Sequence, residues 1–178
     1  GLGHYMAQWD GGSYARAIES GDKEKGTDSH SLWAKALGYD PKETYTFGSV
    51  KNNAREQAKN HKYATMFGGQ PPRQASILGI SVSDMKQKLK EMHARLPGLA
   101  QITREVQKRA ERPGYHICID GRRTPIYGKH TALVDLLQSF EQAVMKKALC
   151  LLYDKAEAAF GEHGKAWGLC GNYHDEIQ

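Results

Sequence analysis

The sequence predicts an α+β protein in which a basic, all-helical middle is inserted between parts that hold the strands. Apolar residues recur at helical spacing through most of the 178 residues, and β patterns appear only near residues 115–127 and 166–173. Charge divides the chain in the same way. Residues 51–130 hold 16 of the 25 Lys and Arg but 6 of the 20 Asp and Glu, a net charge of +10, and the remainder carries −5. This distribution predicts a polyanionic partner, with a solvated helical surface as the alternative.

Helical periodicity, interrupted by glycines and prolines, accounts for most of the chain. It predicts helices over residues 2–20 with a break at Gly11-Gly12, 28–37, 55–67, 74–78, 84–96, 97–111 and 131–160. Asp28 or Ser29 caps the second of these helices, and Ser83 caps the fifth. Residues 21–27 and 39–53 are predicted to be loops, the second of them irregular.

The period of the pattern changes after residue 114. Residues 115–119 and 124–127 are predicted to be strands, and the Asp-Gly-Arg-Arg turn between them is typical of a β-hairpin. A further strand is expected over residues 166–173, leading into His174-Asp175-Glu176.

Cysteine content and hydropathy argue against a disulfide scaffold, a zinc site and a membrane protein. Three cysteines without framework spacing predict a reducing compartment rather than a disulfide scaffold. Cys170 and His174 stand four residues apart, but no partner pair completes a zinc site. No stretch approaches the ~20 apolar residues that a membrane span requires, so no membrane association is expected.

One predicted helix carries an unusual stripe of side chains, in the segment REQAKNHKYATMFGG at residues 55–69. Side chains at every fourth position share one helical face, and here they are Arg55, Lys59, Tyr63 and Phe67. Guanidinium and ammonium groups bind phosphate oxygens, and an aromatic ring stacks on a base or sugar. The stripe therefore has the parts to hold a nucleoside triphosphate lengthwise, and the two glycines after it admit another backbone or a base. The alternative is a surface helix whose aromatic end packs inward.

The second candidate site is the acidic segment YHDEIQ at residues 173–178. Neighbouring carboxylates on an extended chain point to opposite faces, so Asp175 and Glu176 are not expected to bind one ion equally. A carboxylate at a strand end or hairpin tip is a good Mg²⁺ ligand, with a second acidic residue needed from elsewhere. The alternative is an ordinary acidic turn.

These two segments resemble motifs of the A family of DNA polymerases, the bacterial DNA polymerase I and phage replicative group. The family's fingers motif, Arg-x3-Lys-x3-Phe/Tyr-x3-Tyr/Phe-Gly, is matched from Arg55 to Gly68, and its palm motif His-Asp-Glu is matched by residues 174–176. Other segments resemble the stretch after the family's first catalytic motif (GLGHYMAQWDGGSYARAI, 1–18), its Asp-x-His (DSH, 28–30), its Gly-Arg segment (DGRRTPIY, 120–127) and the stretch with its minor-groove glutamine (LLQS, 136–139).

The resemblance implies a partial polymerase palm, an antiparallel sheet with helices, into which an all-helical fingers subdomain is inserted. Residues 1–22 and 116–178 would be palm, truncated at the catalytic hairpin, and residues 23–115 would be fingers. The implied activity is template-directed transfer of nucleotides from dNTPs to a primer 3′-hydroxyl through two Mg²⁺ ions. The implied setting is a longer polymerase acting on primer–template DNA in the cytoplasm of an infected bacterial host, with a processivity factor that the sequence does not identify.

Roles for single residues follow from their places in the family motifs. His30, Arg55 and Lys59 would bind the triphosphate, and Lys59 would also act in catalysis. Tyr63 would lie beside the sugar. Phe67, where the family more often has Tyr, would stack near the templating base pair.

The remaining roles concern metal and DNA. Asp175 would ligate the catalytic Mg²⁺ ions, with Glu176 as a further ligand and His174 supporting at the DNA. Gln138 would donate to the minor-groove acceptors that every base pair presents. Arg122 and Arg123 in the Gly-Arg segment would contact DNA.

Some features depart from the family pattern. His130 replaces an Arg, Val134 replaces an Asn, and the segment between His30 and Arg55 is longer than usual. The family's first catalytic Asp is expected before Gly1, so the chain alone is expected to be inactive, and the second strand of the acidic hairpin is expected to be missing.

Two rival functions use the same residues. A single-subunit phage-type RNA polymerase shares the Arg-x3-Lys stripe and the His-Asp motif, but Glu176 and the LLQS segment favour the DNA enzyme. A non-catalytic DNA-binding fragment would use the +10 segment for phosphates, although Asp175-Glu176 has no use in plain binding.

Overall fold

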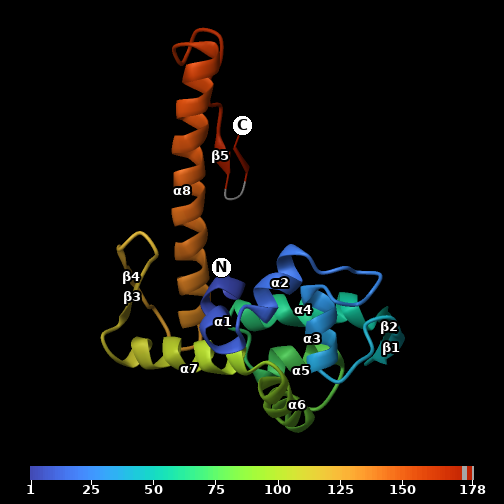
Figure 1. The fold of residues 1–178 in the computed structure, drawn as a ribbon. Helices are drawn as coiled ribbons and strands as arrows, with labels where there is room; N and C mark the ends of the chain where they lie inside the picture. The colour runs from blue at the N-terminus through green and yellow to red at the C-terminus, as the bar shows by residue number, and fades with distance from the viewer. Residues whose placement is uncertain (174–175, 178) are drawn as a thin grey trace.

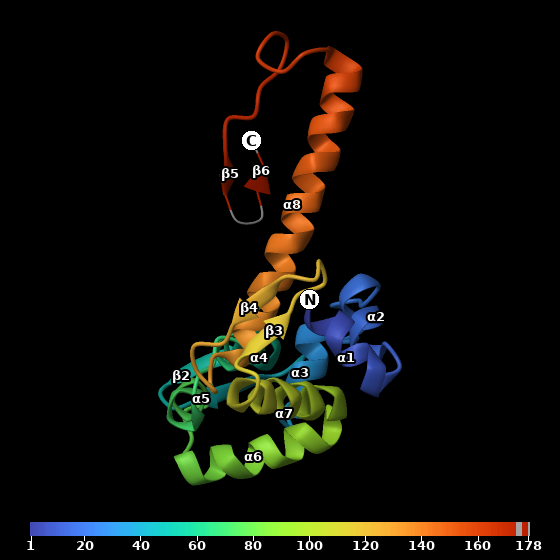
Figure 2. The same cartoon turned by 90° about the vertical axis from the view of Figure 1, so that its left-hand side faces the viewer.

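The computed structural model describes residues 1–173 and 176–177, and side chains through residue 171. Figure 1 shows a helical body from which one long helix projects as a rod. The helices are α1 (Leu2–Asp10), α2 (Ser13–Glu19), α3 (Ser29–Ala36), α4 (Ala54–Met66), α5 (Pro71–Leu78), α6 (Val82–Arg95), α7 (Pro97–Glu111) and α8 (Ala132–Phe160). The projecting helix is α8, and the chain turns at its far end and returns along it (Figures 1 and 2).

Within the described residues, the strands form three separate antiparallel hairpins. They are β1 (Thr44–Phe47) with β2 (Val50–Asn53), β3 (Tyr115–Ile117) with β4 (Arg123–Pro125), and β5 (Asn172–Tyr173) with β6 (Glu176–Ile177). The predicted α+β class is therefore confirmed. The described residues build no larger antiparallel sheet.

Most predicted helices are confirmed because their caps and breaks lie where the sequence places them. Gly11 has φ 60° at the break between α1 and α2, and the Asp28 side chain caps α3 by accepting from the His30 amide at 3.0 Å. The cap of α6 is Ser81, which accepts from the Asp84 amide at 3.0 Å, so the prediction of Ser83 was wrong. Residues Ser81 to Asp84 have the spacing of a capping box, in which the cap lies three positions before the acid.

The loop prediction for residues 39–53 was wrong, because β1 and β2 form a hairpin there with Thr44 opposite Asn53 and Phe47 opposite Val50. Phe47 is buried, whereas Thr44 and Thr46 are exposed, and this alternation is typical of a strand with one covered face. The turn between β1 and β2 packs closely against Gly79 at the end of α5, where an added Cβ would lie 1.8 Å from the Gly48 nitrogen. The hairpin is thereby held against the end of α5.

Other elements also differ from the predictions, among them the strands expected over 115–119 and 124–127, which are Tyr115–Ile117 and Arg123–Pro125. α5 begins at Pro71 rather than residue 74, because a proline is well suited to the first turn of a helix. The strand predicted over 166–173 is confined to Asn172–Tyr173. The second strand of the acidic hairpin, expected to be missing, is present as Glu176–Ile177 and pairs with β5.

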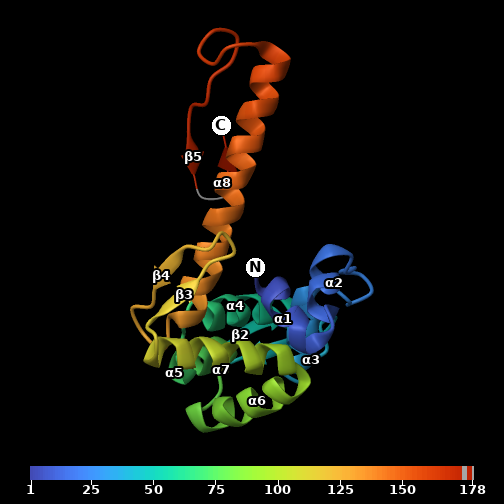
Figure 3. The same cartoon turned by 60° about the vertical axis from the view of Figure 1, so that its left-hand side comes forward.

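One apolar core joins the body to the base of α8. Trp33 of α3, Met85 and Met92 of α6, Ile102 of α7 and Leu136 of α8 all belong to it and are at most 1% exposed. Burial of each such side chain contributes about 1.5–3 kcal/mol. Figure 3 shows α6 and α7 stacked at the end of the molecule opposite the far end of α8, with the β3–β4 hairpin beside the base of that helix.

The outer half of α8 differs from its base, because Leu151, Leu152 and Phe160 are exposed there. Within the described residues, no helix combines the length and apolar character that crossing a bilayer requires.

Candidate functional site

Helix α4 presents the cationic and aromatic stripe. The Asn53 side chain starts the helix by accepting from the Arg55 amide at 2.9 Å and the Glu56 amide at 3.4 Å. Tyr63 is 44% exposed and Phe67 is 61% exposed, so the alternative in which the aromatic end packs inward was wrong. A different row of side chains is buried against the body: Ala54, Ala58, His61 and Lys62.

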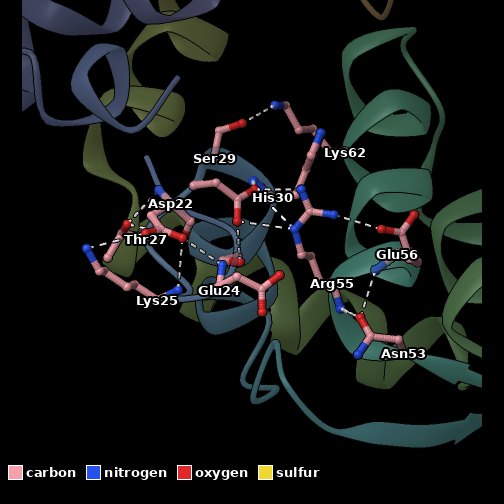
Figure 4. Close-up of polar contacts among 12 residues, drawn as sticks. Asp22, Glu24, Lys25, Thr27, Ser29, His30, Asn53, Arg55, Glu56 and Lys62 are labelled. Carbon is pink, nitrogen blue, oxygen red and sulfur yellow. Dashed lines mark hydrogen bonds and ion pairs between the residues drawn. The ribbon is translucent and has the colours of Figure 1, made fainter. Parts of the chain in front are cut away.

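Arg55 stands at the start of the stripe and is held by two carboxylates. Its guanidinium donates to Asp28 at 3.0–3.2 Å and to Glu56 at 2.7 Å (Figure 4). Burial raises the pKa of Asp28, but hydrogen bonds from Arg55, Ser31 and the His30 amide more than reverse this, so the pKa lies well below its ordinary value. The Asp28 hydrogen bond raises the pKa of Arg55, and the pair is fully ionised near neutral pH.

His30 lies beside the stripe, because Asp28 caps α3 and α3 packs on α4. The rings of His30 and Tyr63 are 6.2 Å apart between centroids. Burial lowers the pKa of His30, and the charges of Lys62 and Arg55 lower it further. The imidazole is therefore neutral near pH 7, where one ring nitrogen donates a hydrogen bond. The structure thus brings together His30, Arg55 and Tyr63 from segments that the sequence separates.

The first glycine after α4 makes the close backbone contact that the sequence predicts. Gly68 has φ 77°, and a Cβ there would lie 2.4 Å from the carbonyl oxygen of His130. The loop before α8 therefore packs directly on the C-terminal end of α4. His130, one of the departures from the family pattern, makes this contact through its backbone carbonyl.

Tyr63 and Phe67 also form one wall of an open cleft of about 720 Å³. The opposite walls come from the β1–β2 hairpin, through Phe47 and Val50, and from α5, through Arg73. The segment between His30 and Arg55, which the sequence marks as longer than usual, therefore builds a wall next to the aromatic end of α4.

The predicted DNA contacts lie on other elements. Gln138 is exposed on α8. Arg122 is exposed and pairs with Asp120 at 2.6 Å, and the guanidinium of Arg123 lies 5.0 Å from the centre of the Tyr115 ring. The turn between β3 and β4 thus presents two arginines to solvent.

The sequence of this chain is similar to those of several phage proteins. No family model matches the chain. A DNA polymerase of Mycobacterium phage D29 is 30% identical over 189 residues, which cover 98% of this chain and 28% of the relative. The DNA-directed DNA polymerases of Enterobacteria phage T3 and Escherichia phage T7 are each 24% identical and cover 99% of this chain. Its relatives are phage DNA polymerases.

The resemblance to DNA polymerases that the motifs indicate is thus confirmed. The chain spans about a quarter of the length of these polymerases, 25% to 28%. A solved structure, the POL domain of Pol1 from M. smegmatis in complex with DNA primer-template and dNTP, matches 99% of this chain and 31% of its own with a TM-score of 0.71 at 18% identity. The chain therefore has a polymerase-domain fold.

The acidic motif of the polymerase resemblance is only partly described. His174 and Asp175 lie outside the described residues, and Glu176 is described as a backbone position in β6 opposite Tyr173. Among the described residues, no group of three His, Cys, Asp or Glu side chains is arranged to hold a metal ion. Cys118, Cys150 and Cys170 are free thiols.

Sequence reasoning missed the buried polar contacts between α4 and α3. Lys62 is buried and donates to the Ser29 hydroxyl at 3.2 Å, and the Trp33 indole donates to His61 at 3.1 Å. Their partners lie 33 and 28 residues away along the chain, and no local pattern pairs them. Helical phase places residues 61 and 65 away from the stripe, but it places residue 62 beside Arg55 and so gave no signal that Lys62 is buried.

Proposed function

We propose that this chain is the nucleotide-binding part of a longer DNA polymerase that extends a primer 3′-hydroxyl on template DNA in an infected bacterial cell. One observation carries the proposal: Arg55, Tyr63 and the neutral His30 gather along a stripe whose aromatic end is exposed, in a chain whose relatives are phage DNA polymerases. An RNA polymerase is not favoured, because the named relatives are DNA enzymes.

The proposed division is fingers over residues 23–115 and palm over residues 1–22 and 116–178. It is supported by the arrangement in Figure 1, where α3 to α6 and the β1–β2 hairpin gather on one side of the body and α8 stands on the other. The division also separates charge, because residues 23–115 carry a net charge of +8 and the remainder carries −3. Adjacent surfaces of opposite charge suit a polyanion held near carboxylates.

In the proposed pose the triphosphate lies along the first half of α4. Lys59 and His30 donate to phosphate oxygens, and Arg55 exchanges the Asp28 carboxylate for phosphate, which offers the same paired acceptor oxygens. Lys59 lies in position to neutralise charge that develops on the leaving pyrophosphate. Tyr63 is placed beside the sugar and Phe67 beside the templating pair, where exposed rings offer stacking faces.

The proposed catalytic carboxylates are Asp175, which lies outside the described residues, and Glu176, whose backbone belongs to β6. Carboxylate oxygens are the donors that Mg²⁺ prefers, so the donor set fits this ion. Bound Mg²⁺ supplies Lewis acidity at the primer hydroxyl and at the leaving group. His174 supports this site, and Gln138, Arg122 and Arg123 hold the DNA through the minor groove and backbone.

The decisive experiment is Asp175→Ala in the full-length polymerase, with Asp154→Ala on the exposed face of α8 as the matched control. We expect Asp175→Ala to abolish primer extension while primer–template binding stays near the wild-type value, because the carboxylate holds metal rather than DNA. Asp154→Ala should extend primers normally. Primer extension by Asp175→Ala at a rate near that of the control would disprove the proposed function.

A further inference from the structure

Lys62 is a buried lysine on α4, seven residues after Arg55 and therefore on the same side of the helix. It is 7% exposed, its ammonium donates to the Ser29 hydroxyl at 3.2 Å, and it lies 5.4 Å from the centre of the Tyr14 ring. Figure 4 shows the contact between Lys62 and Ser29 next to Arg55. Lys62 therefore joins three helices, with Tyr14 on α2 and Ser29 on α3. A buried ammonium is costly, so its place here calls for a role beyond packing.

Two cations of α4 bind neighbouring residues at the start of α3, and we call these two contacts ties. Arg55 binds Asp28, the cap of α3, and Lys62 binds Ser29, its first residue. The next residue is His30, whose amide donates to Asp28. The orientation of His30 therefore depends on both ties.

The two ties respond differently to a nucleotide. Arg55 is partly accessible, with its side chain 16% exposed, and in the proposed function it leaves Asp28 for the triphosphate. Lys62 is 7% exposed and is enclosed by Tyr14 of α2 and Ser29 of α3. After the exchange, Lys62 is the cation that remains beside the α3 cap, where the Asp28 charge already acts on it.

We propose that Lys62 is a positioning residue for nucleotide binding: its ammonium, held between Ser29 and Tyr14, keeps the start of α3 and His30 in place when Arg55 exchanges Asp28 for the triphosphate. This inference rests on the proposed function. It assigns to Lys62 no contact with the nucleotide, and its effect passes through Ser29, Asp28 and His30.

The charge state of Lys62 makes the inference testable by pH. Burial lowers the pKa of Lys62 to about 8, against the opposing charge of Asp28. The titratable and charged groups around it are Tyr14 from α2, Asp28 and His30 from α3, and Arg55 and Lys59 from its own helix. Burial raises the pKa of Tyr14 and lowers that of His30, and Asp28 stays ionised, whereas Lys62 changes charge near pH 8.

The test is steady-state primer extension by the full-length polymerase with Lys62→Met, which keeps the apolar stem and removes the charge. Lys42→Met, at an exposed lysine, is the matched control. We expect Lys62→Met to raise the KM for dNTP about tenfold with little change in kcat, because it weakens a ground-state contact. Ser29→Ala, which removes the acceptor and keeps the charge, should raise the KM less. Lys42→Met should match the wild type.

Two further readouts separate positioning from a structural role. The wild-type KM should rise between pH 7 and pH 9 as Lys62 loses its proton at about 8, and this rise should be absent in Lys62→Met. The Tm of Lys62→Met at pH 7 should equal or exceed that of the wild type, because the buried charge is removed. A lowered Tm with kcat and KM impaired together, or identical pH profiles for the two enzymes, would overturn the inference.

Variants of the stripe separate this inference from the function on which it rests. If Arg55→Ala and Lys59→Ala raise the KM and Lys62→Met does not, the role of Lys62 is wrong and the proposed function stands. If Arg55→Ala and Lys59→Ala also leave the KM unchanged, the proposed function fails together with the inference.

Discussion

Replacing Gly68 by alanine probes the contact between the end of α4 and the loop before α8. Gly68 has φ 77°, and an added Cβ would lie 2.4 Å from the His130 carbonyl oxygen, which is backbone. Gly121, in the turn between β3 and β4, has φ 82° and no atom within 4 Å of an added Cβ. The two glycines therefore share the same backbone strain and differ in their surroundings.

The expected losses of stability follow from this comparison. A left-handed conformation costs a non-glycine residue about 1–2 kcal/mol, and this cost applies to both substitutions. Overlap with a packed backbone adds about 1–3 kcal/mol, and this applies only at Gly68. We therefore expect Gly68→Ala to lower the free energy of unfolding by about 2–5 kcal/mol, and Gly121→Ala by about 1–2 kcal/mol.

Equilibrium urea denaturation followed by circular dichroism measures both free energies, provided that the two variants share one m-value. The difference between the two losses of unfolding free energy is the contribution of the close contact between Gly68 and the His130 carbonyl. Equal losses would show that the loop at His130 gives way at no cost, and the contact between Gly68 and that loop would then have no part in holding α4.

Two further predictions concern the start and the middle of the stripe. Asp28→Asn keeps a capping side chain but removes the charge that binds Arg55, so the free energy of unfolding should fall by about 1–3 kcal/mol at pH 7. Because the pKa of Asp28 is lowered in the folded chain, its contribution is present above the unfolded pKa of about 4 and fades below it, so urea titrations at pH 7 and pH 3 should differ; a loss independent of pH would contradict the ion pair. In the proposed pose the Tyr63 hydroxyl substitutes for the missing 3′-hydroxyl of a dideoxynucleotide. Tyr63→Phe should then reject terminators more sharply, measured as the ratio of kcat/KM for dideoxy and deoxy substrates, and an unchanged ratio would remove Tyr63 from the sugar pocket.

The helices were predictable because their signals are local. Gly11-Gly12 and Pro97 mark boundaries, and the structure places α1, α2 and α7 accordingly. The hairpin at residues 44–53 was not predicted, although Thr44 to Phe47 alternates exposed and buried positions, because four residues are too few to distinguish a strand from a loop.

The site was predictable on one face of α4 only. Spacing alone placed Arg55, Lys59, Tyr63 and Phe67 on one face. It did not show that Asp28 would bind Arg55 or that Ser29 would bind Lys62, because those partners are brought to α4 by the packing of α3. A lysine within a polar helix is usually solvated, so its burial becomes visible only when the neighbouring helices are in place.

The shape of α8 has a mechanical consequence. Its 29 residues form a rod whose base is buried through Leu133, Leu136 and Leu137, whereas its outer half is largely exposed. At 1.5 Å per residue the rod is about 43 Å long, so a tilt of about 5° at its base displaces its far end by about 4 Å. The chain reaches the hairpin of Glu176 only by way of that far end (Figure 2). Small tilts of α8 at the core therefore become larger displacements at its far end. The distance from the β5–β6 hairpin to α4 depends on how tightly Leu133, Leu136 and Leu137 are packed in the core.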